Sequence, residues 1–524
     1  MHTCRFSFLF LWLFGTTLPF SAAGQQTVGI FLNTPESFNG YTLFGNNETT
    51  WLIDNCGAVV HTWQSDFDPG LGMYLLDNGD LLRTAEIAGN FNAGGRGGRF
   101  ERLSPDGQIA WAFEYADNTV HAHHDIAPMP NGHFLAIAWE KHSNSESLAA
   151  GRAGGGEIWS ERIVELAPFG NNGAQIVWEW RLWDHLIQDA DPTKNNFGDV
   201  GAHPERVDVN FIGDGDPNDP DWIHLNAIDY HPGLDQILVS SRHFSEVWVI
   251  DHSTTTAEAA GHSGGNQGKG GDLLYRFGNP EAYRRGTAND RLLFGQHDAK
   301  WIAEGLPGAS KIIVFNNQKP GGGSAVEIWS PPVQTDGSYD LAPGAPFGPA
   351  AMDWSYAAPG FSSPILSGAQ VLPNGNILIC EGKKGRIFEV TPEKTMVWEY
   401  INPVNRNGGP TAQGGTVHFN DLFRATRYAP DFPGLANFDL TPGPPVEINP
   451  WPLDCTIYEA TPVAETPRPV AGFRIEGNPF GDQLVVFSET PQTRPVTLFS
   501  ITGAVVFSGI LKPGKNIFDL TGLP

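Results

Sequence analysis

Short segments in which apolar and polar residues alternate recur along most of the chain. Alternation with a period of two is typical of a β-strand that buries one face. Many of these segments end in a strand rich in Trp, Tyr and Phe. Six such aromatic strands occur, at residues 61–63, 111–115, 178–180, 275–277, 354–356 and 398–400. The pattern predicts six copies of one strand-rich unit.

Tight turns separate the strands within a unit. Asn-Gly pairs, which close two-residue β-hairpins, precede apolar strands at Asn78-Gly79, Asn131-Gly132 and Asn374-Gly375. Each unit is therefore predicted to be a sheet of four antiparallel strands. One such sheet cannot cover both of its faces, whereas a ring of sheets packs each one against its neighbours. We predict an all-β fold, a six-bladed β-propeller.

The two ends of the propeller are expected to share one blade. The first complete unit begins near Gly72, so the hairpin at 43–63 lacks inner strands of its own. Residues 418–458 are the segment that we expect to supply them. Cys56 and Cys455 would then lie in the same blade. The sequence does not decide between a disulfide and two free thiols at this position.

The ends of the chain differ from the repeats. Arg5, an apolar run at 6–20 and small residues at 21–23 are typical of a signal peptide. A signal peptide implies a secreted protein, located in the periplasm, outside the cell or on its surface. The expected segments are a signal peptide at 1–23, a propeller at 28–460, a linker at 461–470 and a small β-sandwich-like module at 471–524.

Composition and charge narrow the function classes. The 62 glycines and 41 prolines fit a fold with many turns. The formal net charge of −26 argues against a nucleic-acid partner. After the signal peptide no segment is apolar over the ~20 residues needed to cross a bilayer, so we expect no membrane span.

Histidines recur where the inner strands of the blades should begin. The inner strands of a propeller line its axis, so their first residues converge on one small volume. His124, His224, His297 and His418 occupy these positions. Four histidines at equivalent positions favour a functional site over four separate structural roles.

Two further residues indicate what such a site would bind. Arg242 follows His224 on the next strand, and its planar guanidinium suits a tetrahedral oxyanion. Asn226 lies two residues from His224, on the same strand face, and offers an amide donor. Metal hydrolysis, carbonyl chemistry and transfer of an anionic group are all open, and the arginine and asparagine favour the last.

Neither a metal nor another cofactor is expected. A metal site would usually carry carboxylate or cysteine ligands beside the histidines. One acidic run contains Asp214, Asp216, Asp219 and Asp221. A calcium-binding loop is one interpretation of this run, and an ordinary hydrated loop is the favoured one. The glycine-rich stretch at 94–98 lacks the Lys-Ser/Thr of a phosphate-binding loop and is interpreted as a turn.

Residues 28–460 resemble the aryl-sulfate sulfotransferase (arylsulfotransferase) family. The resemblance is carried by His121-Ala-His-His124-Asp125, by His224-Leu-Asn226 followed by Arg242, and by Gly295-Gln296-His297-Asp298-Ala299. It implies an enzyme that needs no nucleotide sulfate donor (PAPS). Such an enzyme moves a sulfuryl group from a phenolic sulfate ester to a phenol through a sulfohistidine, with ping-pong kinetics.

The resemblance also implies a role for each site residue. His297 matches the nucleophile, and His224, Asn226 and Arg242 match groups that hold the sulfuryl oxygens. His124 matches a further catalytic histidine; it is chosen over its neighbours because it precedes an aspartate, as His297 does. His418 is assigned to substrate binding from its position alone.

The last fifty residues or so resemble a C-terminal sorting domain of type IX secretion cargo. The matching segments are 478–482, 498–503 and 518–523. The resemblance implies the type IX secretion machinery as a partner and an incomplete domain, while a plain accessory β-module stays open. A homodimer also stays open, because we find no separate N-terminal domain of the kind that contributes to dimers in the sulfotransferase family.

Two other functions stay open at this point. A non-catalytic propeller that binds a partner would not need histidines at the axis. A sulfate-ester hydrolase would use the same residues but transfer the group to water. Release of free sulfate without a phenol acceptor distinguishes the hydrolase from a transferase.

Overall fold

The computed structural model describes residues 26–452, 454–458, 473–476, 483–488, 493–499 and 505–519. These residues fall into two compact units, divided between residues 459 and 460, and each unit is described by itself. The segments predicted as signal peptide and linker lie outside the described residues.

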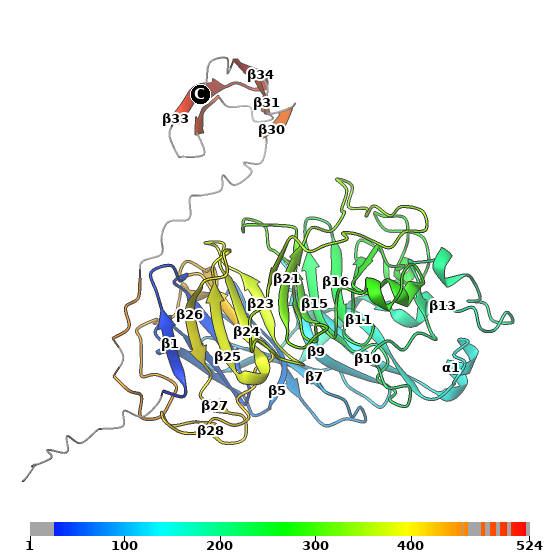
Figure 1. Cartoon of the computed structure of the whole chain (residues 1–524), viewed down its shortest axis with the longest axis horizontal. Coiled ribbons are helices and arrows are strands. Elements are labelled where there is room, and N and C mark those ends of the chain that lie inside the picture. The colour runs from blue at the N-terminus through cyan, green and yellow to red at the C-terminus, as the bar shows by residue number, and fades with distance from the viewer. Residues whose placement is uncertain are drawn as a thin grey trace, which may run out of the picture. The chain divides into compact units, whose positions relative to one another are not determined.

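The first unit is a six-bladed β-propeller (Figure 1), as predicted. Each blade is an antiparallel sheet, numbered here in the order in which the blades follow the ring. Blade 1 is β29 (Thr426–Tyr428), β2 (Tyr41–Gly45), β3 (Thr49–Ile53) and β4 (Val59–Gln64). Blade 2 is β5 (Pro69–Leu75), β6 (Leu81–Glu86), β7 (Gly98–Leu103) and β8 (Ile109–Glu114). Blade 3 is β9 (Val120–Pro128), β10 (Phe134–His142), β11 (Ile158–Phe169) and β12 (Gly173–Arg181).

The remaining three blades follow the same plan. Blade 4 is β15 (Leu225–His231), β16 (Gln236–Ser241), β17 (Glu246–Asp251) and β18 (Tyr275–Phe277). Blade 5 is β19 (His297–Trp301), β20 (Ile312–Asn316), β21 (Ala325–Trp329) and β22 (Trp354–Tyr356). Blade 6 is β23 (Gly368–Val371), β24 (Ile377–Glu381), β25 (Arg386–Val390) and β26 (Met396–Ile401), with β1 (Gly29–Asn33) added at its outer edge. All six predicted aromatic segments lie on the outermost strand of a blade or, in blade 6, on the strand beside β1.

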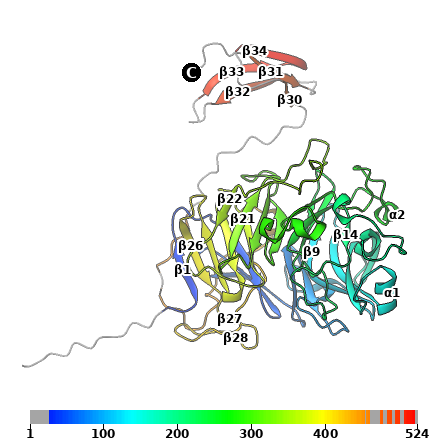
Figure 2. The ribbon, with the colours of Figure 1, turned by 45° about the vertical axis from the view of Figure 1, so that its right-hand side comes forward.

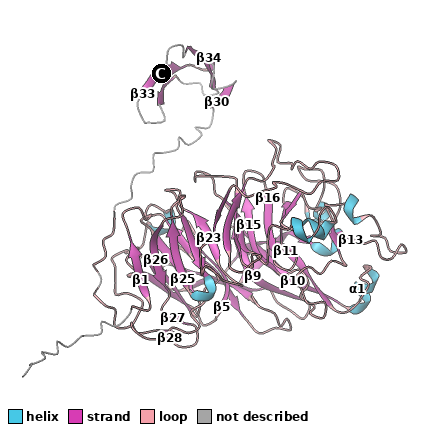
Figure 3. Ribbon diagram, viewed as in Figure 1, coloured by secondary structure: helices cyan, strands magenta, loops and turns pink. Residues whose placement is uncertain are grey.

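Most other elements are short and belong to loops between strands. Figure 3 shows that the described helices gather mainly at the side of the propeller that carries β13. The helices with four or more residues are α1 (Asn144–Ala149), α2 (Thr256–Ala259), η1 (Leu182–His185) and η3 (Pro280–Tyr283). The three-residue helical turns are η2 (Val200–Ala202), η4 (Ala288–Asp290), η5 (Gly382–Lys384) and η6 (Pro433–Leu435). Two short strand pairs are β13 (Leu186–Ile187) with β14 (Val207–Asp208), and β27 (Val404–Asn405) with β28 (Gly409–Pro410).

The ring closes where the sequence predicted it to close, but with a different inner strand boundary. β29, from the end of the propeller, pairs with β2, so both ends of the unit share blade 1. Cys56 and Cys455 form a disulfide that ties the two ends together. The inner strand begins at Thr426, so His418 does not open it as predicted. The residues between them form an irregular segment in which Asn420 donates to the carbonyls of Lys384 and Asn402, and this segment carries the chain to the axis.

The faces between blades are filled by large side chains. Trp63, Trp111, Trp180 and Trp398 come from outer strands and are almost fully buried. Trp398 lies at the closing junction, where its Nε1 donates to the carbonyl of Asn55 at 2.8 Å. The guanidinium of Arg427 lies 4.2 Å from the centre of the Trp398 ring. Blade 6 is thus held on blade 1 by an apolar contact, a hydrogen bond and a cation–π contact.

The described residues of the second unit form five strands. β30 (Phe473–Glu476), β31 (Gln483–Ser488) and β34 (Gly514–Asp519) form one sheet, and β32 (Arg494–Phe499) pairs with β33 (Val505–Leu511). This agrees with a small β-module, and its resemblance to a sorting domain stays a prediction. No helix in the described part of either unit has the length and apolar character needed to cross a bilayer.

We predict that Trp398→Ala lowers the free energy of unfolding by about 3–5 kcal/mol, because it leaves a cavity at the closing junction. Trp451→Ala is the matched control, since that side chain is 38% exposed. The control should change the free energy of unfolding by no more than about 0.5 kcal/mol. Urea unfolding followed by circular dichroism measures both variants, and equal losses would contradict the assigned role of Trp398.

Candidate active site

Three of the predicted histidines meet at the axis of the propeller. His124 lies on β9, His224 immediately precedes β15, and His297 begins β19. The ring centres of His124 and His224 are 4.6 Å apart. The positive charge of Arg242 opposes protonation of both His124 and His297, so both imidazoles lie near the guanidinium. The structure therefore brings together four of the six residues predicted from the sequence.

The inner strands bulge at these histidines. The pairing register breaks on β9 near His124, at the start of β15 after His224, and on β19 after His297. His124, His224 and Asp298 have φ angles of 49°, 54° and 55°, in the left-handed region that non-glycine residues seldom adopt. Bulges redirect side chains, and strained backbone of this kind costs roughly 1–3 kcal/mol per residue. The bulges and the left-handed backbone thus coincide with the positions of the axial histidines.

His297 is held by an amide that sequence analysis missed. Its Nδ1 lies 2.9 Å from Oδ1 of Asn317 and 3.1 Å from the carbonyl oxygen of Gly295. The amide nitrogen of Asn317 donates to the carbonyls of Ser363 and Leu366, each at 2.8 Å, and this assigns its oxygen to the His297 side. Both neighbours of Nδ1 are thus acceptors. Nδ1 carries the hydrogen, and Nε2 is left with a free lone pair.

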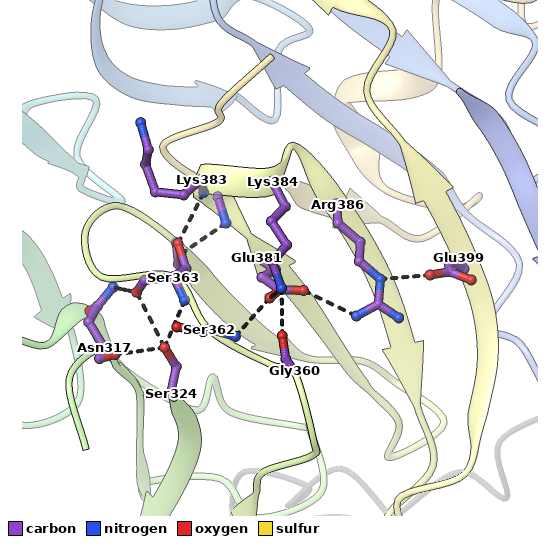
Figure 4. Close-up of polar contacts among 12 residues, drawn as sticks. Asn317, Ser324, Gly360, Ser362, Ser363, Glu381, Lys383, Lys384, Arg386 and Glu399 are labelled. Carbon is purple, nitrogen blue, oxygen red and sulfur yellow. Dashed lines mark hydrogen bonds and ion pairs between the residues drawn. The ribbon is translucent and has the colours of Figure 1, made fainter. Parts of the chain in front are cut away.

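The orientation of Asn317 is supported by a network at the junction of blades 5 and 6 (Figure 4). The hydroxyl of Ser324 donates to the backbone carbonyl of Asn317 at 2.6 Å and accepts from the backbone N–H of Ser363 at 2.9 Å. The hydroxyl of Ser363 accepts from the N–H of Lys383 at 3.0 Å. A buried, fully hydrogen-bonded network of this kind fixes the amide, and with it the tautomer of His297.

His297 is neutral at ordinary pH. Burial, reinforced by the positive charge of Arg242, lowers the pKa of His297 to about 3. His124 is affected in the same way, because burial and the neighbouring His224 hold its pKa well below 6.5. His124 and His297 are therefore neutral imidazoles rather than imidazolium ions at ordinary pH.

His224 is oriented by a buried carboxylate. Its Nδ1 lies 2.6 Å from Oδ2 of Asp221, and the other oxygen of Asp221 accepts from Nε1 of Trp139 at 3.1 Å. Although burial opposes ionisation, the charge and hydrogen bond of His224 keep the pKa of Asp221 below its ordinary value. Asp221 is therefore committed to His224, while Asp214 pairs with Arg291. The acidic run at 214–221 is thus divided between two structural tasks, which argues against the calcium loop.

His124 continues into a second hydrogen-bonded chain. Its Nδ1 faces Nδ1 of His123 at 2.8 Å, and Nε2 of His123 lies 2.9 Å from Oε2 of Glu161. Burial lowers the pKa of His123 to about 3 and raises the pKa of Glu161 well above 4.5. His123 also stacks on Trp139, with ring centres 4.0 Å apart. The three groups form a chain along which protons can pass.

Arg242 supplies the positive charge of the site. Its side chain is half-buried, and among the described residues it makes no ion pair or side-chain hydrogen bond. Burial lowers its pKa, and the charges of Asp214 and Asp221 oppose that change. A guanidinium without a carboxylate partner, next to neutral histidines, is suited to an anion.

The other two predicted residues lie differently. Asn226 is fully buried, and its amide donates to the carbonyl of Gln296 at 2.7 Å, directly before His297. That contact braces the backbone at His297. His418 is exposed in the loop that leads to blade 1, and none of the contacts found for the three axial histidines involves it. The substrate-binding roles of Asn226 and His418 stay predictions.

The glycine-rich stretch at 94–98 is more than a turn. A Cβ atom on Gly95 would lie 2.0 Å from the His124 ring, and one on Gly98 would lie 2.6 Å from the His121 ring. The carbonyl of Gly95 accepts from the N–H of His124 at 2.7 Å. Only glycine permits this close approach, so the stretch covers the histidines. Sequence analysis missed this role because the histidine partners lie more than twenty residues away.

The family model described as Arylsulfotransferase (ASST) matches residues 31–407. The chain belongs to the arylsulfotransferase family. Membership supports an aryl sulfotransferase that uses no nucleotide sulfate donor, in agreement with the resemblance carried by the histidine motifs. The matched range includes His124, His224, Arg242 and His297, and it ends before His418.

Other comparisons place no further limit on the function of this arylsulfotransferase. No curated protein matches its sequence. A protein of unknown function from Bacteroides caccae is 11% identical, with a TM-score of 0.41, over 75% of this chain and 99% of that one. A periplasmic gluconolactonase from Pseudomonas aeruginosa is 11% identical, with a TM-score of 0.37, over 92% of this chain and 100% of that one. Likenesses at this level carry no conclusion about activity.

We predict that Asn317→Asp moves the acid limb of the sulfotransferase pH profile upward. A carboxylate beside Nδ1 favours the imidazolium form, so the pKa of His297 rises from about 3 and the neutral nucleophile is lost at a higher pH. The parent enzyme should keep its rate from pH 8 to about pH 5, well below an ordinary histidine pKa of about 6.5. The measurement is kcat/KM for 4-nitrophenyl sulfate with excess phenol as a function of pH.

Asn374→Asp is the control for this variant, because Asn374 lies in the hairpin between β23 and β24 and has no contact with His297. Its profile should match the parent profile. An Asn317→Asp enzyme with a lower rate but an unmoved acid limb would contradict the tautomer argument.

Proposed function

We propose that the protein transfers a sulfuryl group from a phenolic sulfate ester to a phenol, through a covalent sulfohistidine on His297. The observation that carries the proposal is the unprotonated Nε2 of His297. Asn317 and Gly295 both accept at Nδ1, and burial keeps the ring neutral. A neutral imidazole nitrogen with a free lone pair is a competent nucleophile at ordinary pH.

The first half-reaction uses His297 and the cationic side of the site. Nε2 attacks sulfur, the bond from sulfur to the phenolic oxygen breaks, and the electron pair leaves on the phenolate. The new N–S bond leaves positive charge on the ring, and the Asn317 oxygen stabilises that charge by accepting the hydrogen bond from Nδ1. Arg242 and His224 offset negative charge on the sulfuryl oxygens, as oxyanion donors do in other transfer enzymes.

The second half-reaction needs a base for the acceptor phenol, and we assign that role to His124. The phenol oxygen attacks sulfur, the N–S electron pair returns to Nε2 of His297, and the phenol proton goes to His124. The facing nitrogens of His124 and His123 pass a proton onward to Glu161. Because burial raises the pKa of Glu161, its carboxylate binds a proton readily. Across the two half-reactions, the proton lost by the acceptor phenol balances the proton that the released phenolate takes up from water.

The transferase and the hydrolase differ in the molecule that accepts the sulfuryl group. A hydrolase would use water in the second half-reaction and release sulfate without phenol. A binding module does not fit membership in an enzyme family, and it would not depend on His297.

We also propose that the protein is secreted, with a C-terminal sorting module. The proposal is supported by the residues at 1–23 and by the Cys56–Cys455 disulfide, since disulfides persist in export compartments.

We predict that the parent protein releases nitrophenolate from 4-nitrophenyl sulfate in a manner that depends on added phenol. His297→Asn should lower the rate at least about 10³-fold, because the nucleophile is lost. His203→Asn is the matched control, and we expect it to keep the rate within about twofold, since His203 is 46% exposed, pairs with Glu205 and is not a predicted site residue.

Formation of the sulfohistidine can be measured directly. Mass spectrometry of parent enzyme mixed with 4-nitrophenyl sulfate alone should find one sulfuryl group on His297. Phenol-independent release of free sulfate would favour the hydrolase. Undiminished phenol-dependent activity in His297→Asn would rule out the proposed nucleophile.

A further inference from the structure

Away from the axis, two loops of blades 3 and 4 bring two histidines and an aspartate together. His185 ends η1, which follows β12, while His262 and Asp272 lie between α2 and β18. Nδ1 of His185 and Nδ1 of His262 lie 2.9 and 2.8 Å from the same oxygen, Oδ1 of Asp272. All three atoms lie within 4.8 Å of one another. Figure 2 shows α2 and β14 on this side of the propeller.

The tautomer of His185 leaves a lone pair directed at the carboxylate. Nε2 of His185 lies 2.8 Å from the carbonyl oxygen of Ala259, which can only accept, so Nε2 carries a hydrogen. A neutral His185 then presents the Nδ1 lone pair to a carboxylate oxygen. That arrangement is repulsive unless a second proton or a metal cation lies between the two atoms.

The site is already built around His185. The side chain is fully buried and lies parallel to the Trp180 ring, with ring centres 5.5 Å apart. A Cβ atom on Gly271 would lie 2.6 Å from Nε2 of His185, and the carbonyl of Gly271 accepts from Nε1 of Trp180 at 2.7 Å. A histidine whose outer nitrogen is tied to a backbone carbonyl is the usual arrangement of an oriented metal ligand.

The opposite side of the triad is open. The His262 side chain is 45% exposed and borders a surface pocket of about 500 Å³ that is also lined by Trp183, Asn195 and Arg206. Nε of Arg206 lies 3.9 Å from Oδ2 of Asp272, which leaves Oδ1 for the histidine side. Water from the pocket can reach a fourth position of a tetrahedral centre.

We propose that His185, His262 and Asp272 bind one Zn²⁺ ion, which links the loops of blades 3 and 4. Two imidazole nitrogens and one carboxylate oxygen suit Zn²⁺, whereas Ca²⁺ and Mg²⁺ prefer oxygen ligands alone. Tetrahedral bonds of about 2.0–2.1 Å separate ligand atoms by about 3.3 Å, so small side-chain shifts accommodate the ion. This is the one departure from the expectation of no metal, and it concerns a site outside the catalytic histidines.

The test uses the untagged protein, stripped with a chelator and titrated with ZnCl₂ by calorimetry. We expect binding of one Zn²⁺ per chain at this site and a rise in the thermal midpoint, because an ion that binds only the folded state stabilises it. CaCl₂ and MgCl₂ should give no rise. Loading with Co²⁺ should give the visible absorption bands of a tetrahedral centre.

His262→Ala and Asp272→Asn should each weaken Zn²⁺ binding at least about tenfold and abolish the rise in the midpoint. His203→Ala is the matched control, since His203 is 46% exposed, pairs with Glu205 and lies outside the triad. It should bind Zn²⁺ as the parent does. Absence of a bound ion in the parent, or equal affinity in His262→Ala, would overturn the proposal and leave the triad as a hydrogen-bonded cluster alone.

Discussion

The structure depends on a ring of hydrogen bonds that joins the inner strand of each blade to that of the next. Asp125 on β9, Asp229 on β15 and Asp298 on β19 each accept a backbone N–H from the following inner strand. Tyr74 and Tyr428 serve two other junctions through their hydroxyl groups. The contacts around the ring are Tyr428 to Leu75, Tyr74 to Asp125, Asp125 to Ile228, Asp229 to Trp301, Asp298 to Ala369, and Gln370 to Arg427. Every junction of the propeller is therefore closed at the axis by a side chain.

This ring of hydrogen bonds requires buried aspartate carboxylates. The segment that closes the propeller supplies the positive charge that compensates them. Two of its aspartates directly follow site histidines, namely Asp125 after His124 and Asp298 after His297. Arg424, on the segment that enters blade 1, lies 2.5 Å from Asp125 and 3.4 Å from Asp298. Burial raises the pKa of Asp125, and the Arg424 charge counters that effect. An unpaired carboxylate at this depth would cost several kcal/mol. The segment that enters blade 1 thus brings the cation that compensates the two aspartates beside the site histidines.

The histidines gain their chemical character from the same burial. Removed from water, His124 and His297 stay neutral, and the hydrogen-bond partners of each histidine decide which of its nitrogens is free. Asn317 does this for His297, Asp221 for His224, and His123 with Glu161 for His124. Arg242 is then the uncompensated charge of the site. A protein with a formal net charge of −26 can therefore hold an anionic group, because recognition depends on local charge.

The sequence alone determined the repeat, the six blades, the aromatic strands and the closure between the two ends. These features follow from local periodicity, which a chain carries whatever its neighbours are. It also pointed to His124, His224, His297 and Arg242, whose side chains the structure brings together at the axis, although His124 lies inside β9 rather than at its predicted start. Their catalytic roles stay predictions. Tertiary structure alone decided the partners of these residues. Asn317, Asp221, Glu161 and Gly95 act through contacts across turns, strands and blade junctions, and no local pattern marks them. The same holds for His418, which an irregular approach to blade 1 leaves in a loop, and for the triad of His185, His262 and Asp272. Local periodicity specifies which strands form, whereas the packing of one blade on the next specifies which side chains touch.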